Sequence, residues 1–207
     1  QKYPYKTYPL KEIVLKNDGL RRGPFGGSIK KSCFVSKGYK VYEQGNAIND
    51  TVHYGKYYIT QKKYDEMKSF HVKPYDLLVS CSGTLGRITE LPGDAPEGII
   101  NQALLRIRLN RDIVRSDYFI QYFRSEMFQR MILNKSQGSA MNNLVGIKEF
   151  REIKLNIPRI DFQPAMVEII SEKLSVCDSI EQTVDTALKQ AEAMRQSILK
   201  EAFEGNL

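Results

Sequence analysis

Residues 177–198 read CDSIEQTVDTALKQAEAMRQSI, and their apolar side chains recur at alternating steps of three and four residues. This spacing is the a/d pattern of a coiled coil, which keeps successive apolar side chains on one stripe of a helix. The stripe consists of Cys177, Ile180, Val184, Ala187, Ala191, Met194 and Ile198. We expect one helix from about Gln163 to Phe203, roughly 60 Å long at about 1.5 Å per residue.

A stripe of that length needs a second long helix against it, and nothing upstream has the same pattern. We therefore expect the helix to pair with a second copy of the chain or with a second, different half. Met166, Ile170 and Leu174 step by fours, so the heptad phase is clear only from Cys177 onward. The closest pairing is expected in the C-terminal two-thirds of the helix.

The composition describes a folded domain with an additional extended element. The chain has 207 residues, of which 42% are hydrophobic, and its mean hydropathy is −0.41. No apolar run approaches the roughly 20 residues that span a bilayer, and residues 1–10 do not read as a signal peptide. We expect a cytoplasmic protein without membrane contact, trimmed or cut from something longer because it opens with Gln.

The three cysteines, Cys33, Cys81 and Cys177, are odd in number and widely spaced. This usage is typical of reduced cytosolic thiols, and neither a disulfide nor a metal site is expected. Only His53 and His71 could add nitrogen ligands, and no metal-ligand constellation can be drawn from them.

The net charge of +7 is unevenly distributed. Residues 1–160 hold 27 Lys and Arg against 15 Asp and Glu, whereas residues 161–207 hold 4 against 9. A basic domain followed by an acidic rod indicates a part that faces nucleic acid, joined to a part that meets protein.

The predicted fold class is α+β, a globular β-rich domain over residues 1–158 followed by a hinge and a long coiled-coil helix over 159–207. Short β-type runs occur at residues 32–35, 39–44, 56–60, 76–82 and 99–109. One amphipathic helix is expected over Ser116–Leu133, with its aromatic face in the core. A last strand, 153–158, ends at a proline.

Motifs of self-sufficient catalysis are missing. The sequence has no GxSxG elbow, P-loop, HExxH or GxGxxG after a strand. The Asn/Asp-Pro-Pro-aromatic loop of adenine methyltransferases has only a distant counterpart, Lys73-Pro74-Tyr75-Asp76, which we interpret as a turn. We do not expect an enzyme that acts alone.

Three loops combine flexible backbone, hydroxyl or amide side chains and nearby cations: residues 21–31, 80–87 and 137–143. Cations neutralise phosphates, while amides, hydroxyls and arginines can read base edges. The candidate DNA contacts are Arg21, Arg22, Lys30, Lys31, Ser82, Thr84 and Arg87, with Gln44, Asn46, Gln137 and Asn142 as weaker candidates. The glycines expected to shape the loops are Gly23, Gly26, Gly27, Gly83 and Gly86. For any single residue, the alternative to a DNA contact is a hydrogen bond from its side chain to the backbone of its own loop.

The order of these segments resembles the specificity subunit of type I restriction–modification enzymes. The matching segments are residues 23–27 (GPFGG), 41–47 (VYEQGNA), 73–87 (KPYDLLVSCSGTLGR), 98–104 (GIINQAL), 137–143 (QGSAMNN), 155–158 (LNIP) and 195–207 (RQSILKEAFEGNL). They follow the family order across nearly the whole chain. One departure is Arg159-Ile-Asp-Phe-Gln-Pro164, where family members usually have proline, small apolar residues and a Glu-Gln pair.

The resemblance implies a subunit with two recognition domains, each followed by a long helix, whose helices pair antiparallel and set the spacing of a split double-stranded DNA target. This chain resembles half of such a subunit, either a natural half or a fragment. The resemblance implies no catalytic residues here. S-adenosylmethionine, ATP and Mg²⁺ would belong to separate modification (methyltransferase) and restriction subunits.

Two rival hypotheses come from other functional classes. One is a coiled-coil scaffold whose basic domain binds RNA or an acidic protein. The other is a self-sufficient nuclease or methyltransferase, which would turn over DNA without a partner.

Overall fold

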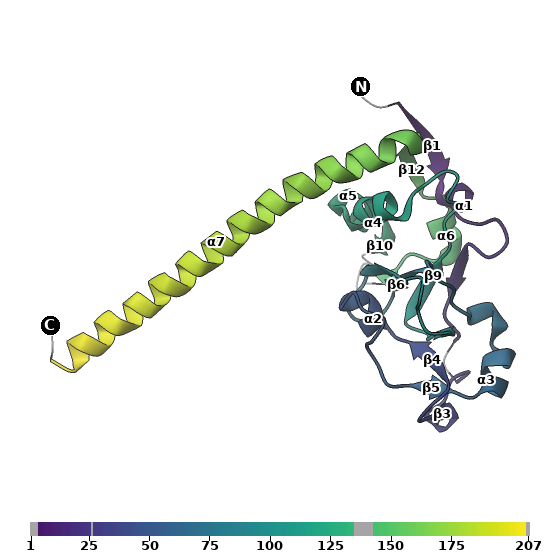
Figure 1. Cartoon of the computed structure of the whole chain (residues 1–207), viewed down its shortest axis with the longest axis horizontal. Coiled ribbons are helices and arrows are strands. Elements are labelled where there is room, and N and C mark those ends of the chain that lie inside the picture. The colour runs from purple at the N-terminus through teal and green to yellow at the C-terminus, as the bar shows by residue number, and fades with distance from the viewer. Residues whose placement is uncertain (1–3, 26, 135–142, 206–207) are drawn as a thin grey trace. The chain divides into compact units, whose positions relative to one another are not determined.

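The computed structural model describes residues 4–25, 27–134 and 143–205 (Figure 1). The chain divides into two compact units, Gln1–Gln163 and Pro164–Leu207. The first unit is built from short strands and helices, and the second consists of one long helix. The predicted mixed fold class, with a long C-terminal helix, is confirmed.

The centre of the first unit is an antiparallel sheet in the order β2-β9-β6-β7. Its strands are β2 (Leu20–Arg22), β9 (Leu104–Ile107), β6 (Leu77–Ser80) and β7 (Ile88–Glu90). Both faces of β6 and β9 are buried, which explains their nearly continuous apolar sequence. The register pairs Arg22 with Leu105, Leu104 with Ser80, and Val79 with Ile88.

A second four-stranded sheet has the order β3-β5-β4-β8. It contains β3 (Phe34–Val35), β5 (Tyr58–Ile59), β4 (Tyr39–Tyr42) and β8 (Gly98–Ile100), and β4 and β8 run parallel. The two sheets share one apolar core, because Tyr42 and Ile100 pack in the same cluster as Leu78 and Leu104. The core therefore holds strands of both sheets in fixed relation.

Two small sheets and a set of short helices complete this unit. The strand pairs are β1 (Tyr5–Pro9) with β12 (Lys154–Pro158), and β10 (Leu133–Asn134) with β11 (Asn143–Leu144). The helices are α1 (Leu10–Ile13), α2 (Gln44–Ile48), α3 (Gln61–Glu66), α4 (Ser116–Arg124), α5 (Glu126–Ile132) and α6 (Ile147–Glu152). Short 3₁₀ turns cover Lys31–Cys33, Lys68–Phe70 and Ile160–Phe162.

The single helix expected over Ser116–Leu133 is two helices, α4 and α5. Ser125 adopts an extended backbone, φ −63° and ψ 142°, and its side chain accepts a hydrogen bond from the Phe128 N–H at 3.3 Å. A serine that caps a new helix start ends the preceding helix. The aromatic face is core as predicted, since Phe119, Phe123 and Phe128 are completely buried.

Residues 159–164, at the start of the segment predicted to form a hinge and a long helix, contain the last 3₁₀ turn and the first residues of the long helix. Gln163 is buried, and its amide nitrogen donates to the carbonyl oxygens of Ile113 and Pro158 at 2.9 and 3.0 Å. Its amide oxygen accepts from the Arg115 N–H at 2.8 Å. These bonds tie the end of the first unit to the segment before α4.

Helix α7 spans Gln163–Phe203, 41 residues, and so confirms the predicted extent of the long helix. All seven stripe residues are exposed to solvent within this chain. Within the described residues, no helix combines the length and the apolar character that crossing a membrane requires. In the same residues, no group of three or more His, Cys, Asp or Glu side chains is placed to hold a metal ion.

Candidate nucleic-acid interface

Three loops leave the same end of the β2-β9-β6-β7 sheet, because its strands are antiparallel. The Gly23 N–H donates to the Leu104 carbonyl at 2.9 Å, and the Cys81 N–H donates to the Ala103 carbonyl at 2.7 Å. Arg22 Nη2 donates to the Cys81 carbonyl at 3.2 Å. Residues 23–25, 27–31, 81–87 and 101–103 are therefore gathered in one place, which we call the loop end of the sheet.

The loop after β6 is closed by its own hydrogen bonds. Ser80 Oγ donates to the Thr84 carbonyl at 2.6 Å and accepts from the Arg87 N–H at 3.0 Å. Gly83 and Gly86 have φ of +60° and +70°, a left-handed backbone that favours glycine. The closed loop exposes Ser82, Thr84 and Arg87.

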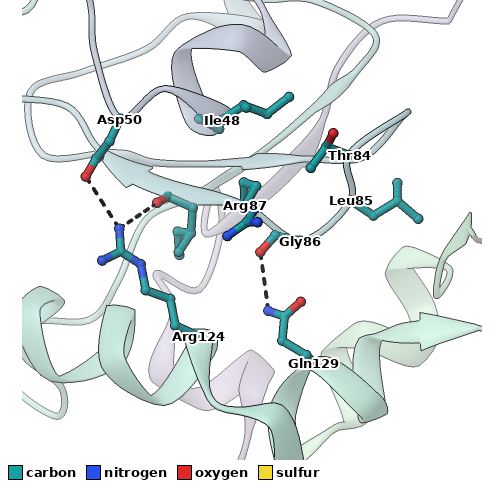
Figure 2. A pocket seen from close by; sticks show the side chains of 10 residues that line it. Ile48, Asp50, Thr84, Leu85, Gly86, Arg87, Arg124 and Gln129 are labelled. Carbon is teal, nitrogen blue, oxygen red and sulfur yellow. Dashed lines mark hydrogen bonds and ion pairs between the residues drawn. The ribbon is translucent and has the colours of Figure 1, made fainter. Parts of the chain in front are cut away.

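Helix α5 braces this loop from the side, as Figure 2 shows. Gln129 Nε2 donates to the Gly86 carbonyl at 3.3 Å and to the Phe123 carbonyl at 2.7 Å. A cleft of about 470 Å³ lies between the loop and α4, and Thr84, Arg87, Arg124 and Asp50 line it.

The charges in this cleft are partly neutralised. Arg124 Nη2 lies 3.5 Å from the Asp50 carboxylate and donates to the Ile88 carbonyl at 3.3 Å. Asp50 also accepts a hydrogen bond from Thr89 Oγ1. The Arg87 guanidinium has no ion-pair partner among the described side chains, so it is available to an external anion.

The other predicted cations differ in availability. Lys30 and Lys31 are exposed, and neither forms an ion pair with a described residue. Arg21 and Arg22 are half-buried in β2, where Arg22 supports the loop after β6 and Arg21 Nε is buried without a described partner. The lysines are thus the freer cations of the loop after β2.

Gln44 and the glycines fit the loop end in different ways. Gln44 begins α2 and lies beside Gly83, with its Oε1 buried and lacking a partner among the described atoms. Gly23 is pressed against the backbone, because a Cβ there would lie 1.7 Å from the Asn101 carbonyl oxygen. Gly27 has φ +95° and open space around it.

Asn46 is a correction to the predicted set of DNA contacts. Its side chain is completely buried, and its Oδ1 accepts from the Glu43 N–H at 2.8 Å. Its Nδ2 donates to the Thr51 and Tyr54 carbonyls at 2.9 and 3.2 Å. Both ends of the amide serve the fold, so Asn46 is not exposed to DNA. Gly26, Gln137 and Asn142 lie outside the described residues.

Sequence reasoning missed several side chains at or near the loop end: Phe25, Gln102, Arg124 and Gln129. Phe25 and Gln102 are exposed there, while Arg124 and Gln129 reach it from α4 and α5. Gln102 lies in the run 99–109, which the sequence pattern predicts as one strand. The structure instead has a turn at 101–103. No local pattern distinguishes Arg124 from any other cation on a helix surface.

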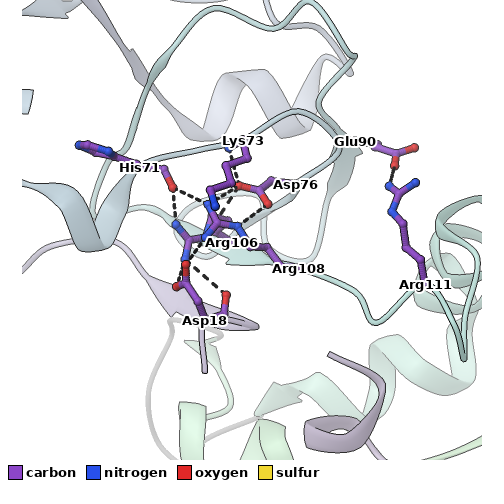
Figure 3. A network of polar contacts seen from close by, with 8 residues as sticks. All are labelled: Asp18, His71, Lys73, Asp76, Glu90, Arg106, Arg108 and Arg111. Atoms are coloured by element: carbon purple, nitrogen blue, oxygen red, sulfur yellow. Dashed lines mark hydrogen bonds and ion pairs between the residues drawn. The ribbon is translucent and has the colours of Figure 1, made fainter. Parts of the chain in front are cut away.

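A buried network of charges lies in the same sheet, as Figure 3 shows. Arg108 donates to the Asp76 carboxylate from Nε at 2.7 Å and from Nη2 at 3.0 Å. Arg106 and Arg108 both hydrogen-bond to Asp18 and to the His71 carbonyl. Burial lowers the pKa of Arg106, and the neighbouring Arg108 lowers it further. The network fixes β9 to the segments that precede β2 and β6.

The sequence family described as type I restriction modification DNA specificity domain matches residues 5–190. The EcoBI specificity subunit of Escherichia coli, a type I restriction enzyme subunit, is 28% identical over 142 residues, which are 69% of this chain and 30% of that protein. The StySPI specificity subunit of Salmonella potsdam is 29% identical over 104 residues, 50% of this chain and 22% of that protein.

Two solved structures share the fold. A chain from the structure titled "Structural basis underlying complex assembly and conformational transition of the type I R-M system" aligns with a TM-score of 0.70 at 14% identity, over 100% of this chain and 50% of that one. The HsdS subunit of Thermoanaerobacter tengcongensis aligns with a TM-score of 0.55 at 18% identity, over 98% and 46%.

The chain spans about half the length of these two structures, and its matches cover less than a third of the curated relatives. The resemblance inferred from the seven segments is confirmed. Because the family match extends from the first strand through most of α7, this chain belongs to the type I restriction–modification DNA specificity domain family.

Proposed function

We propose that this chain reads one half of a split double-stranded DNA target for a type I restriction–modification enzyme in the cytoplasm. The observation that carries the proposal is the convergence of three loops at one end of a rigid sheet. They present the unpaired Arg87, the hydroxyls of Ser82 and Thr84, and two exposed lysines. Cations there bind the phosphate backbone, while hydroxyl and amide groups read base edges.

In this proposal the chain recognises DNA and its partners carry out the chemistry. The methyltransferase subunits hold S-adenosylmethionine, and the restriction subunit uses ATP and Mg²⁺. The names of the curated relatives support this division, since each is called the specificity subunit of a type I restriction enzyme. The family membership likewise favours DNA recognition over a scaffold that binds RNA or an acidic protein.

Helix α7 would join two such recognition domains. Ile180, Val184 and Met194 are 58%, 51% and 66% exposed within the chain, and a second helix would remove this apolar surface from water. The second helix comes from another copy of the chain or from another half of a longer subunit. The coding sequence on either side distinguishes the two arrangements.

The stripe suits an antiparallel pair of identical helices. From Ile180 to Ile198 its positions are spaced symmetrically about residue 189. A two-fold axis at that point sets Ala187 against Ala191 of the second copy, where small side chains permit close approach. Glu181 and Arg195 lie on one flank of the stripe, so each Glu181 would face the second copy's Arg195.

The test is to map methylated adenines in DNA from cells that carry this chain with its methyltransferase partner. A bipartite sequence with fixed spacing is the expected result. A competition titration on that duplex should then favour it over a scrambled one by about 10³ or more. Equal affinity for both duplexes would show only nonspecific cation binding, and turnover by the purified chain alone would contradict the non-catalytic role.

A further inference from the structure

Phe25 is the one exposed phenylalanine among the described residues of the first unit. Its side chain is 88% exposed, whereas the other phenylalanines described before α7 are buried or half-buried. The only other phenylalanine that is equally exposed in the described residues is Phe203, at the end of α7. Removing an exposed aromatic ring from water lowers the free energy, so Phe25 is a candidate contact for a binding partner.

The base of the Phe25 loop is fixed, so the ring is held outward. Gly23 is hydrogen-bonded to Leu104 at 2.9 Å and packed against the Asn101 backbone, and Pro24 is buried. Beyond the ring, the Ser28 N–H donates to the Phe25 carbonyl at 3.3 Å and closes a turn. The ring is therefore exposed on a loop whose base is anchored.

The surroundings of Phe25 combine apolar side chains with exposed cations. Exposed Lys30 and Lys31 follow on the same loop, and neither is paired with a described acidic residue. A cavity of about 220 Å³ beside the ring is lined by Lys31, Gln102 and the Glu43 side chain, and by the apolar residues Pro24, Ile29, Phe34, Val41 and Tyr57 among others. A partner that is apolar throughout would leave the two lysines unpaired, whereas a nucleic acid offers phosphates to the lysines and stacked rings to Phe25.

We propose that Phe25 is a wedge that inserts between two stacked base pairs of the DNA target. Lys30 and Lys31 would neutralise the phosphates beside the opened step, and the ring would replace the lost base stacking. Proteins that insert apolar wedges kink the duplex, so flexible steps accept them more readily than stiff ones. The wedge would thus add sequence preference without a hydrogen bond to a base edge. This inference rests on the proposed function.

The experiment uses the chain in complex with its methyltransferase partner and the duplex found by adenine mapping. 2-Aminopurine is placed at each position in turn, except at the methylated adenines, because methylation itself extrudes those bases. If Phe25 unstacks two neighbouring base pairs, the 2-aminopurine fluorescence should rise at that one base step. Phe25→Ala should abolish this rise and weaken binding about tenfold. Phe25→Leu keeps a smaller apolar side chain and should retain most of the fluorescence rise and most of the binding affinity.

The matched control is Phe203→Ala, which removes an equally exposed ring elsewhere and should change neither signal. An unchanged fluorescence profile in Phe25→Ala, or no rise with the unmodified chain, overturns the wedge. Loss of the methyltransferase partner from the Phe25→Ala complex overturns it too, and assigns the ring to a protein contact. Failure of the unmodified complex to prefer the mapped duplex is a separate result, which defeats the proposed function and the wedge together.

Discussion

The side-chain amide of Gln129 on α5 donates to the backbone carbonyl of Gly86 at 3.3 Å, across 43 residues of sequence. The same nitrogen donates to the Phe123 carbonyl at 2.7 Å, so Gln129 connects the end of α4 to the loop after β6. A Cβ at residue 86 would lie 2.3 Å from Gln129 Oε1, whereas a Cβ at residue 83 would meet only Gln44, at 3.6 Å. The loop is thus braced at Gly86 and open at Gly83.

Gly86→Ala should weaken DNA binding more than Gly83→Ala. Both substitutions place a side chain at positive φ, at a cost of roughly 1–2 kcal/mol each, but only the first also displaces Gln129. Thermal unfolding and duplex titration measure the two effects. Adding Gln129→Ala to Gly86→Ala should cause little further loss of binding, because the brace is already displaced, and equal losses in the two glycine variants would contradict the brace.

Arg87→Ala should reduce the salt dependence of DNA binding. If its guanidinium contacts one phosphate, the slope of log K against log salt falls by about 0.9. Titrations between low and moderate salt give the slope. Lys154→Ala is the control, since this exposed lysine lies on β12 in another sheet. A slope that is equal in Arg87→Ala and the unmodified chain would remove Arg87 from the interface.

Asp76→Ala should destabilise the first unit strongly. The substitution removes the buried carboxylate that accepts two hydrogen bonds from Arg108 and leaves both arginines with only the half-exposed Asp18, and breaking a buried ion pair costs about 3–5 kcal/mol. Glu152→Ala removes the exposed pair with Lys11 and should cost less than about 1 kcal/mol. Urea unfolding compares the two free energies, and similar values would mean that the network of Figure 3 contributes little.

Ala187→Glu combined with Ala191→Glu should convert paired chains into monomers and weaken DNA binding. Two carboxylates in the stripe would be buried without partners against the second helix. Lys189→Glu, on the opposite side of α7, should leave the pair intact. Sedimentation measures the mass, and a dimer that persists in the double variant would contradict the pairing proposal.

Cross-linking tests the antiparallel register of the same pair. Leu188 lies beside the expected two-fold axis, so Leu188→Cys in a chain with Cys177→Ser should form a disulfide with its own copy under mild oxidation. A cysteine placed at Ile198 by the same strategy should not, because antiparallel pairing separates the two copies of that position.

Cys81 should resist alkylation at neutral pH. Burial raises the pKa of its thiol to about 11, and the reactive thiolate is therefore scarce until the pH approaches that value. Cys177 is exposed and should react readily in the monomeric variant. Mass spectrometry after iodoacetamide treatment follows both residues from pH 7 to pH 10, and equal rates at pH 7 would contradict the burial of Cys81.

The structure corrected two expectations for the first unit. The run Ser116–Leu133 has helical spacing throughout, yet Ser125 caps a new helix and breaks it. Asn46 reads as an available amide, but the Glu43-to-Asn46 spacing is that of a capping box. The box itself is a local signal that could have been found in the sequence. The hydrogen bonds from Asn46 to the Thr51 and Tyr54 carbonyls, which accompany its complete burial, could not have been found in the sequence.

By itself the sequence determined the long helix, its extent and its apolar stripe, because helical periodicity is a local property that neighbouring residues set together. It also determined the family, through the order of seven short segments. Only the tertiary structure decided which loops meet. β2 pairs with β9 from more than 80 residues away, and β6 pairs with the other edge of β9; the two pairings together bring Phe25, Gln102 and Arg87 to one end of a sheet. Strand partners depend on the burial of both faces in a common core, which no local pattern specifies.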